Sequence, residues 1–448
     1  MRSGRQRPCS IRYLLISPNR ETLMFRRIPS PKPMKPRAFA VLSSASPGPL
    51  RRSAARIAAA GFVLIAAACL GPEEGEGQVQ LPEYTLEPTV RIGSLDDPET
   101  ALETITLLAT TPDDGIAVAQ PSSSSIWIFS SSGERRRVIG GEGDGPGEFR
   151  AVSAMGWRGD TLWASDGGNF RVTLFPPGDG SPTVVGAPDR RAEGVIRAPL
   201  PAGDGLWVLY RRWTLDPVLR TYREEIWSAG EDWAPLERLG SLPDGPDNFQ
   251  IELPGTQGPT THVDPIPEHP LFALAPDISS LTTVRREVER GGYAITRVGI
   301  DGDTVFHRDH SVEPVPVSDG TLTAILEEYL SQEGLQRLAS STRALRDAVI
   351  SGLDLPEVHP AVTKVVVGTD GSSWLRGPDD RSGTVRWTVL DPNGEPSFTV
   401  QTGREIGAFR GMIETQNLVR MVADADGIWA VELGELDVPY LIRYELRR

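Results

Sequence analysis

The chain has 448 residues, with 46 basic and 60 acidic side chains, five histidines and two cysteines. Residues 1–68 hold 13 of the basic side chains and one of the acidic ones, so residues 69–448 carry 33 basic and 59 acidic groups. An acidic body of this kind argues against binding to nucleic acid or to anionic lipid surfaces, because both need clustered lysine and arginine.

Residues 1–68 form a leader that ends in a short apolar run. Arg51, Arg52 and Arg56 precede the run at 57–68, which is about 12 residues long and too short for a membrane-spanning helix of roughly 20 residues. Arginines followed by a short apolar run and small residues are typical of a secretory signal peptide. We therefore expect the leader to direct export and to be removed.

The residue after this run is the only cysteine that would remain once the leader is cut. Residues 66–69, Ala-Ala-Ala-Cys, resemble the bacterial lipobox, although Ala66 stands where that motif usually has leucine. The resemblance implies acylation of Cys69 and attachment to a membrane on the extracytoplasmic side, in the cell envelope. The alternative is an ordinary signal peptide with a chance cysteine. Residues 69–80 are acidic and glycine-rich, which predicts a flexible tether.

Residues 81–448 alternate short apolar strands with Gly, Asp and Pro turns, and an internal unit recurs along them. Regular short strands with a repeat favour an all-β fold, a six-bladed β-propeller with one helical insertion. The last copy lacks an outer strand, and the segment 84–92 is expected to supply it and close the ring, since this would satisfy the open sheet edges. The six copies are marked by Asp114–Gly115, Gly159–Asp160, Gly203–Asp204, Tyr293–Val298, Asp370–Gly371 and Asp426–Gly427.

Two insertions interrupt the repeats. Residues at about 243–276 are rich in Pro, Gly and His and are expected to form a long irregular loop. Residues at about 321–350 are the one stretch with helical periodicity. We expect Thr321 to cap a first helix and Gly334 to separate it from a second, and the pair to pack on the rim or over one mouth of the ring.

One repeat carries a more specific pattern, a glycine-rich turn at 140–149 followed by two strands. Its motif residues are Gly145, Pro146, Gly147, Phe149, Asp166, Asn169, Arg171 and Phe175. This stretch resembles one module of the NHL-type propellers, and the layout of the body resembles uncharacterised six-bladed propeller lipoproteins of bacteria. The resemblance implies structural roles: Phe149 fills the groove between blades, while Asp166 and Asn169 bond to turn backbone.

No nucleotide-binding loop, nucleophile elbow or zinc helix is present, so the sequence assigns no catalytic or cofactor-binding residue. Similar lactonases hold calcium in the propeller channel, and some NHL propellers are zinc-dependent lyases, so both metals are alternatives. Strand-edge turns supply the calcium candidates Asp160, Asp166, Asn169, Asp204, Asp370 and Asp426, all residue types that turns themselves require. The candidates for zinc are His262, Asp264, His269, His307 and His310.

Three functions are consistent with these patterns. The first is a membrane-tethered module that binds an unidentified peptide, glycan or small molecule at a propeller mouth. The second is a metal-dependent lactonase- or lyase-like enzyme with its site in the channel. The third is a structural partner in an envelope complex, with the helical insertion as its docking surface.

Overall fold

The chain from Gln78 to Arg448 forms one compact unit. The computed structural model describes residues 80–94, 96–97, 99–169, 171–185, 195–202, 205–213, 222–229, 235–244, 248–253, 260–266, 268, 270–287, 291–299, 302–379, 383–403, 406, 421–434 and 438–448. The leader, Cys69, Asp204 and His269 lie outside these ranges. Among the described helices, none has the length and apolar character needed to cross a bilayer.

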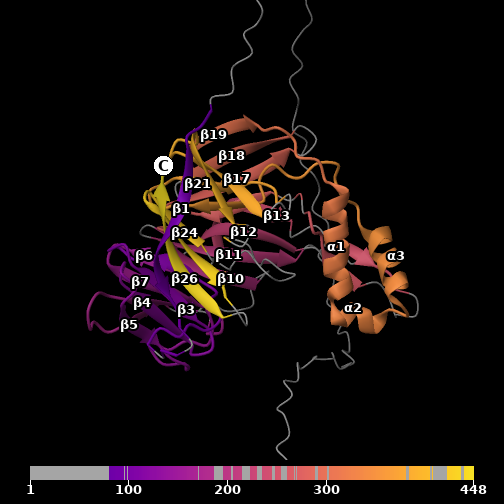
Figure 1. Ribbon diagram of the computed structural model, residues 1–448. Helices are drawn as coiled ribbons and strands as arrows, with labels where there is room; N and C mark the ends of the chain where they lie inside the picture. The colour runs from indigo at the N-terminus through magenta and orange to yellow at the C-terminus, as the bar shows by residue number, and fades with distance from the viewer. Residues whose placement is uncertain are drawn as a thin grey trace, which may run out of the picture. The chain divides into compact units, whose positions relative to one another are not determined.

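The strands form consecutive four-stranded antiparallel units in chain order, which is the organisation of a β-propeller (Figure 1). The first three units contain the following strands. They are β2 (Leu108–Thr110), β3 (Ile116–Gln120), β4 (Ser125–Phe129) and β5 (Arg135–Gly140); β6 (Val152–Arg158), β7 (Thr161–Asp166), β8 (Arg171–Phe175) and β9 (Thr183–Val185); and β10 (Val195–Ala202), β11 (Gly205–Trp213), β12 (Tyr222–Ala229) and β13 (Pro235–Asp244).

Two further complete units and a last, composite unit follow. The complete units are β16 (Leu271–Leu274), β17 (Ser280–Glu287), β18 (Gly292–Gly299) and β19 (Thr304–Ser311), then β20 (Lys364–Val367), β21 (Ser373–Arg376), β22 (Thr384–Leu390) and β23 (Pro396–Gly403). The last unit combines β24 (Met421–Asp424), β25 (Gly427–Leu433) and β26 (Pro439–Arg447) with β1 (Glu83–Ile92) from the start of the body. The described strands can thus be divided into six such units, of which the last two are joined through β1 in one eight-stranded sheet.

The segment expected to complete the last unit does so. β1 pairs antiparallel with β26, from Thr85 opposite Arg447 to Ile92 opposite Leu441. Its first residues also pair in parallel with β23, with Tyr84 opposite Val400. The first strand of the body therefore joins the last two units and leaves neither of these sheet edges open.

The core lies between neighbouring units. The first strands of successive units contact one another from β16 through β20, β24, β2 and β6 to β10. Apolar clusters fill the spaces on both sides of the last unit, and Trp374, Trp387 and Trp429 are fully buried in them. The β-branched and aromatic residues of these strands pack on both faces, which explains why the strands read as nearly continuous apolar runs.

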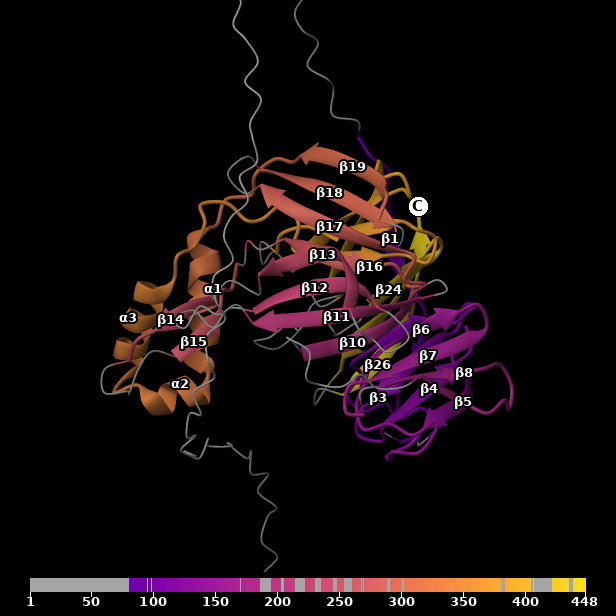
Figure 2. The ribbon, with the colours of Figure 1, turned by 180° about the vertical axis from the view of Figure 1, so that it is seen from behind.

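The two insertions differ from expectation, because they fold together. The first contains the hairpin of β14 (Asn248–Ile251) and β15 (Thr260–Val263) rather than only irregular loop. The second holds three described helices instead of two: α1 (Asp319–Ser331), α2 (Glu333–Leu338) and α3 (Thr342–Gly352). Figure 2 shows the helices beside this hairpin, and one apolar cluster unites Ile251, Leu253 and Ile266 with the helices.

The ends of these helices also differ from the predicted ones. Ser318, not Thr321, caps α1, because its hydroxyl accepts a hydrogen bond from the Thr321 N–H at 3.1 Å. The break after α1 falls at Gln332, two residues before Gly334. Ser341 caps α3 in the same way, through the Ala344 N–H.

Candidate functional site

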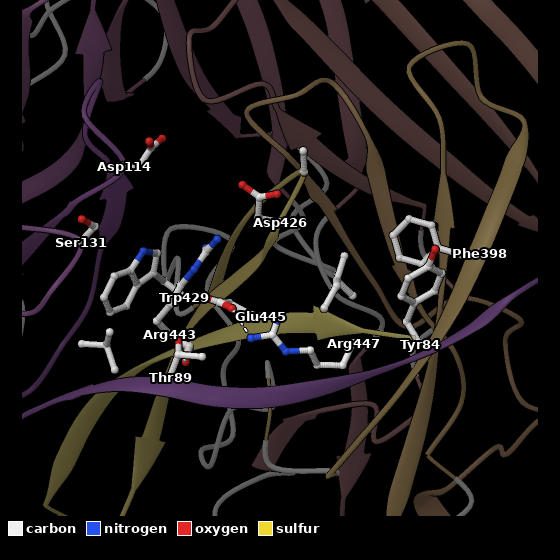
Figure 3. A pocket seen from close by; sticks show the side chains of 13 residues that line it. Tyr84, Thr89, Asp114, Ser131, Phe398, Asp426, Trp429, Arg443, Glu445 and Arg447 are labelled. Atoms are coloured by element: carbon white, nitrogen blue, oxygen red, sulfur yellow. Dashed lines mark hydrogen bonds and ion pairs between the residues drawn. The ribbon is translucent and has the colours of Figure 1, made fainter.

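A pocket of about 500 Å³ lies over the last unit, where it meets the units on either side (Figure 3). Its walls come from segments far apart in the sequence. β1, β25 and β26 form the floor, and the turns before β3 and β25 border one end. A volume of this size falls within the range that small-molecule sites occupy.

One end of the pocket carries two carboxylates. Asp114 sits in the turn between β2 and β3 with a positive φ of 61°, and Asp426 sits in the equivalent turn between β24 and β25. Both residues are exposed. Within the part of the chain that the structure describes, neither carboxylate forms a hydrogen bond or an ion pair. These two groups are therefore available to a ligand.

The two arginines that line the pocket are already engaged. Arg443 donates two hydrogen bonds to the carboxylate of Asp424, at 2.7 and 2.8 Å, and both side chains of this pair are largely buried. Arg447 donates to Glu87 at 3.0 Å and to Glu445 at 2.6 Å. Because each guanidinium has an acidic partner, the pocket as a whole remains acidic.

The floor and the far end of the pocket are aromatic. Tyr84 from β1 and Phe398 from β23 lie with their ring centroids 5.0 Å apart, and Phe398 meets the edge of Trp374. Trp429 lies under the guanidinium of Arg443, which is 6.0 Å from the centre of its ring. The pocket therefore joins an acidic end to an aromatic one (Figure 3).

The glycine-rich turn and the motif of the second unit lie away from this pocket and are held by their own contacts. The carboxylate of Asp166, which is fully buried, accepts hydrogen bonds from the backbone N–H groups of four residues. These are Arg150 at 3.1 Å, Ala151 at 3.0 Å, Gly168 at 3.0 Å and Asn169 at 3.1 Å. The carboxylate thus ties the end of β7 to the chain entering β6.

Two other motif residues bind the glycine-rich turn. The Asn169 amide donates to the Gly143 carbonyl at 3.1 Å. The Arg171 guanidinium donates to three carbonyls of the turn, at 2.7 to 2.8 Å: those of Asp144, Gly145 and Glu148. Both side chains therefore fix turn backbone.

The remaining motif residues shape the turn and fill the space beneath it. The Gly145 N–H donates to the Glu148 carboxylate at 2.7 Å, Pro146 is exposed, and Gly147 has a φ of 85°, which favours glycine. Phe149 is fully buried, with its ring 5.7 Å from that of Phe175, in a cluster shared by the first two units.

The structure does not bring His307 and His310, an alternative zinc pair in the sequence, together around a metal. Both lie on β19, three residues apart, and side chains at that spacing point to opposite faces of a strand. His307 bonds to the Thr296 hydroxyl at 2.8 Å, whereas His310 stacks on Tyr293 and donates to the Gly394 carbonyl at 3.2 Å. Burial lowers the pKa of His310.

The other metal candidates are scattered among local turns and caps. The His262 ring bonds to the Thr260 hydroxyl at 2.9 Å, and Asp264 accepts the Ile266 N–H at 2.8 Å. Asp370 accepts both the N–H and the hydroxyl of Ser372. Among the residues that the structure describes, no three His, Cys, Asp or Glu side chains gather as a metal site would require.

The sequence patterns indicated some of the residues that line the pocket but not the others. Asp114 and Asp426 were marked as starts of repeats, and Asp426 also as a calcium candidate. Tyr84, Phe398 and Arg443 were not singled out, since only the pairing of β1 with β23 and β26 brings them together. Their separation along the chain leaves no local pattern that would have revealed them.

Comparisons with known proteins give structural likeness without a family. No family model matches the sequence, and no curated protein matches it. Among solved structures, a Bacteroides fragilis protein thought to be exported is 12% identical, with a TM-score of 0.42 over 82% of this chain and 99% of that one. Virginiamycin B lyase from Staphylococcus aureus is 9% identical, with a TM-score of 0.36 over 81% of this chain and all of that one.

A gluconolactonase from Xanthomonas campestris is 13% identical, with a TM-score of 0.33 over 81% of this chain and 98% of that one. Likenesses at this level carry no inference about ligand or reaction. The pocket and its residues have to be interpreted on their own chemistry.

Proposed function

We propose that the protein is an extracytoplasmic β-propeller, anchored to a membrane through acylated Cys69, that binds a small ligand in the pocket over its last unit. The observation that carries the binding function is the pocket itself. It combines a volume of about 500 Å³ with two carboxylates that have no partner among the described residues, and with an aromatic end. A concave site with a few convergent polar groups is the usual form of a ligand site.

The anchor is supported by the sequence alone. The apolar run at 57–68 and the cysteine directly after it have the order that lipoprotein processing needs. A dual or triple acyl modification would hold the body stably at a membrane, since each buried methylene adds about 0.8 kcal/mol. The acidic segment before β1 then serves as a spacer.

Membrane fractionation tests the anchor. Wild-type protein is expected in the membrane fraction and resistant to salt washes, with an N-terminal peptide whose mass shows acylated Cys69. The Cys69→Ser variant is expected to lose both properties. If the variant fractionates like wild type, or if the mature N-terminus begins elsewhere, the lipid anchor is wrong.

A filled pocket tests the binding function. Ala425 is exposed and lines the pocket, so Ala425→Trp adds a large side chain there without entering the core. Ala151 is an exposed alanine outside the pocket, and Ala151→Trp is the matched control. A ligand that raises the thermal midpoint of wild type must bind its native state. It should also raise the midpoint of Ala151→Trp but not of Ala425→Trp; equal effects on the two variants would place the site elsewhere.

A further inference from the structure

We propose that the ligand of this pocket is a small organic cation, an amine or a guanidine, carrying an apolar group and an oxygen that accepts a hydrogen bond. This inference rests on the function proposed above. It follows from three properties of the pocket: its unpaired carboxylates, its aromatic end and one buried donor without an acceptor.

The charge of the lining selects a cation. Asp114 and Asp426 are unpaired in the described structure, whereas Arg443 and Arg447 each hold a carboxylate of their own. An anion would meet the free carboxylates and find no free guanidinium. A neutral ligand would lie against both carboxylates without pairing them, whereas an ammonium or guanidinium would form charge-assisted hydrogen bonds with them.

The aromatic end distinguishes an organic cation from a bare metal ion. Calcium takes six to eight oxygen ligands, whereas the carboxylates in the lining of this pocket are those of Asp114 and Asp426, from two separate turns, and Glu445, which is paired with Arg447. Tyr84 and Phe398 stand at the far end of the lining, seen on the right of Figure 3. An amine with an apolar or aromatic group would pair with the carboxylates and cover these rings at the same time.

An independent sign of a ligand comes from Trp429. In the described part of the chain, three other tryptophans donate their indole N–H to a hydroxyl: Trp127 to Ser125, Trp374 to Ser372 and Trp387 to Thr402. Trp429 is fully buried and lines the pocket, yet within the described residues its indole nitrogen has no acceptor, which is also the case for Trp157 outside the pocket.

A buried donor is usually satisfied, because leaving it unpaired costs about 1–3 kcal/mol. Figure 3 shows the indole on the side of the pocket that carries Asp114, with its nitrogen on the ring edge turned towards that end. An oxygen on the ligand, admitted by a small shift of the Arg443 side chain that covers the ring, would supply the missing acceptor.

The proposed lipid attachment site lies a short distance along the chain from a residue that lines this pocket. Tyr84 is the second residue of β1 and lies 15 residues after Cys69. A fully extended chain of that length spans at most about 50 Å. An anchored molecule would therefore keep the pocket close to the bilayer, where the amine would come either from solution or from a lipid headgroup.

The decisive experiment is calorimetric titration of the detergent-solubilised, processed full chain with tyramine, which carries an ammonium for the carboxylates and an aromatic ring for Tyr84 and Phe398. Its matched probes are tyrosol, which replaces the ammonium with a hydroxyl, and 4-hydroxyphenylacetate, in which a carboxylate takes the place of the terminal aminomethyl group. Tyramine is expected to bind, and the neutral and anionic probes to bind at least tenfold more weakly. Equal or tighter binding of either probe would refute the proposal that the ligand is a cation.

Two variants test whether the carboxylates of Asp114 and Asp426 bind the ligand. Asp114→Asn and Asp426→Asn change exposed turn residues without removing a hydrogen bond, and Asp160→Asn is the control in the equivalent turn of the second unit. Each pocket variant is expected to weaken tyramine about tenfold or more, because a hydrogen bond to a charged group contributes about 1.5–3 kcal/mol. The control should match wild type. Unchanged affinity in both pocket variants would refute the proposal.

The outcomes distinguish a failure of this inference from a failure of the proposed binding function on which it rests. If tyrosol or 4-hydroxyphenylacetate binds and Ala425→Trp abolishes that binding, the pocket is a ligand site and only the cation is wrong. If none of the three probes binds, neither the proposed cationic ligand nor the proposed binding function of the pocket is supported.

The source of the amine is settled by a second arm with the lipidated chain in nanodiscs. Tyramine affinity that falls in phosphatidylethanolamine discs relative to phosphatidylcholine discs, which have the same net charge but no primary amine, indicates a headgroup occupant. Equal affinity indicates a free amine.

Discussion

The buried carboxylate of Asp166 gives the sharpest test of how the glycine-rich turn is held. Its oxygen Oδ1 accepts three backbone N–H groups and Oδ2 accepts that of Arg150. Asp166→Asn keeps one acceptor oxygen for the three and turns an amide NH₂ towards the fourth. One buried N–H is then left unpaired, and the expected loss is about 1–3 kcal/mol.

Asp166→Ala removes every one of these acceptors. Four N–H groups lose their partner, and the expected loss rises to about 4–5 kcal/mol, with water entering the space limiting the total. Urea unfolding of the wild type and both variants measures this, since the midpoint falls with stability while the slope reports the surface exposed.

Two results would refute this reasoning. A loss below about 1 kcal/mol in the alanine variant would show that the turn holds without the carboxylate. A loss of stability in Asp166→Asn as large as that in Asp166→Ala would show that the charge of the carboxylate, not the number of acceptors, stabilises the turn. The same series with EDTA or calcium is expected to give unchanged differences; a calcium effect confined to wild type would make Asp166 a ligand.

The remaining predictions concern other contacts between units. Phe149→Ala should cost about 3–5 kcal/mol by urea unfolding, as for a core aromatic; a loss under about 1 kcal/mol would contradict its buried position. Arg297 is buried and bonds across two units, with the Ser373 hydroxyl at 2.8 Å, so Arg297→Met should cost about 2–4 kcal/mol in the same assay. Because burial lowers the pKa of His310, the unfolded chain binds a proton more readily, and stability should fall as the pH drops through about 6.5. His310→Phe, which keeps a ring against Tyr293, should lose less stability over that pH range; identical pH profiles would refute the assignment.

The sequence could predict the repeated part of the fold because its signals are local. Each turn at an Asp–Gly pair precedes an apolar strand, and the copies recur along the body. Even the pairing of β1 with β26 could be predicted, since the last copy lacked an outer strand and only the segment at 84–92 remained to supply it. The prediction needed only the rule that sheet edges are paired.

The folded insertions and the pocket could not be found in this way. The β14–β15 hairpin is stabilised by helices more than 50 residues later, so its own composition resembled a loop. His307 and His310 suggested a metal pair only while their strand was unassigned. The pocket depends on which side chains face one another across three units, and no local spacing encodes that arrangement.

The pairing of β1 with β26 also determines when the fold can be completed. The Thr85 hydroxyl reaches the Arg447 carbonyl across 362 positions of sequence. Closing a free loop of that length costs about 5 kcal/mol of chain entropy, a cost that shrinks as the intervening units fold and shorten the path. Of the described strands, β1 is synthesised first but pairs with β26, the last one made, so one of its edges stays open to other chains until synthesis is complete. Loss of only residues 439–448, which include β26, would therefore leave β1 with its short parallel pairing to β23 alone and the other units without their closing sheet.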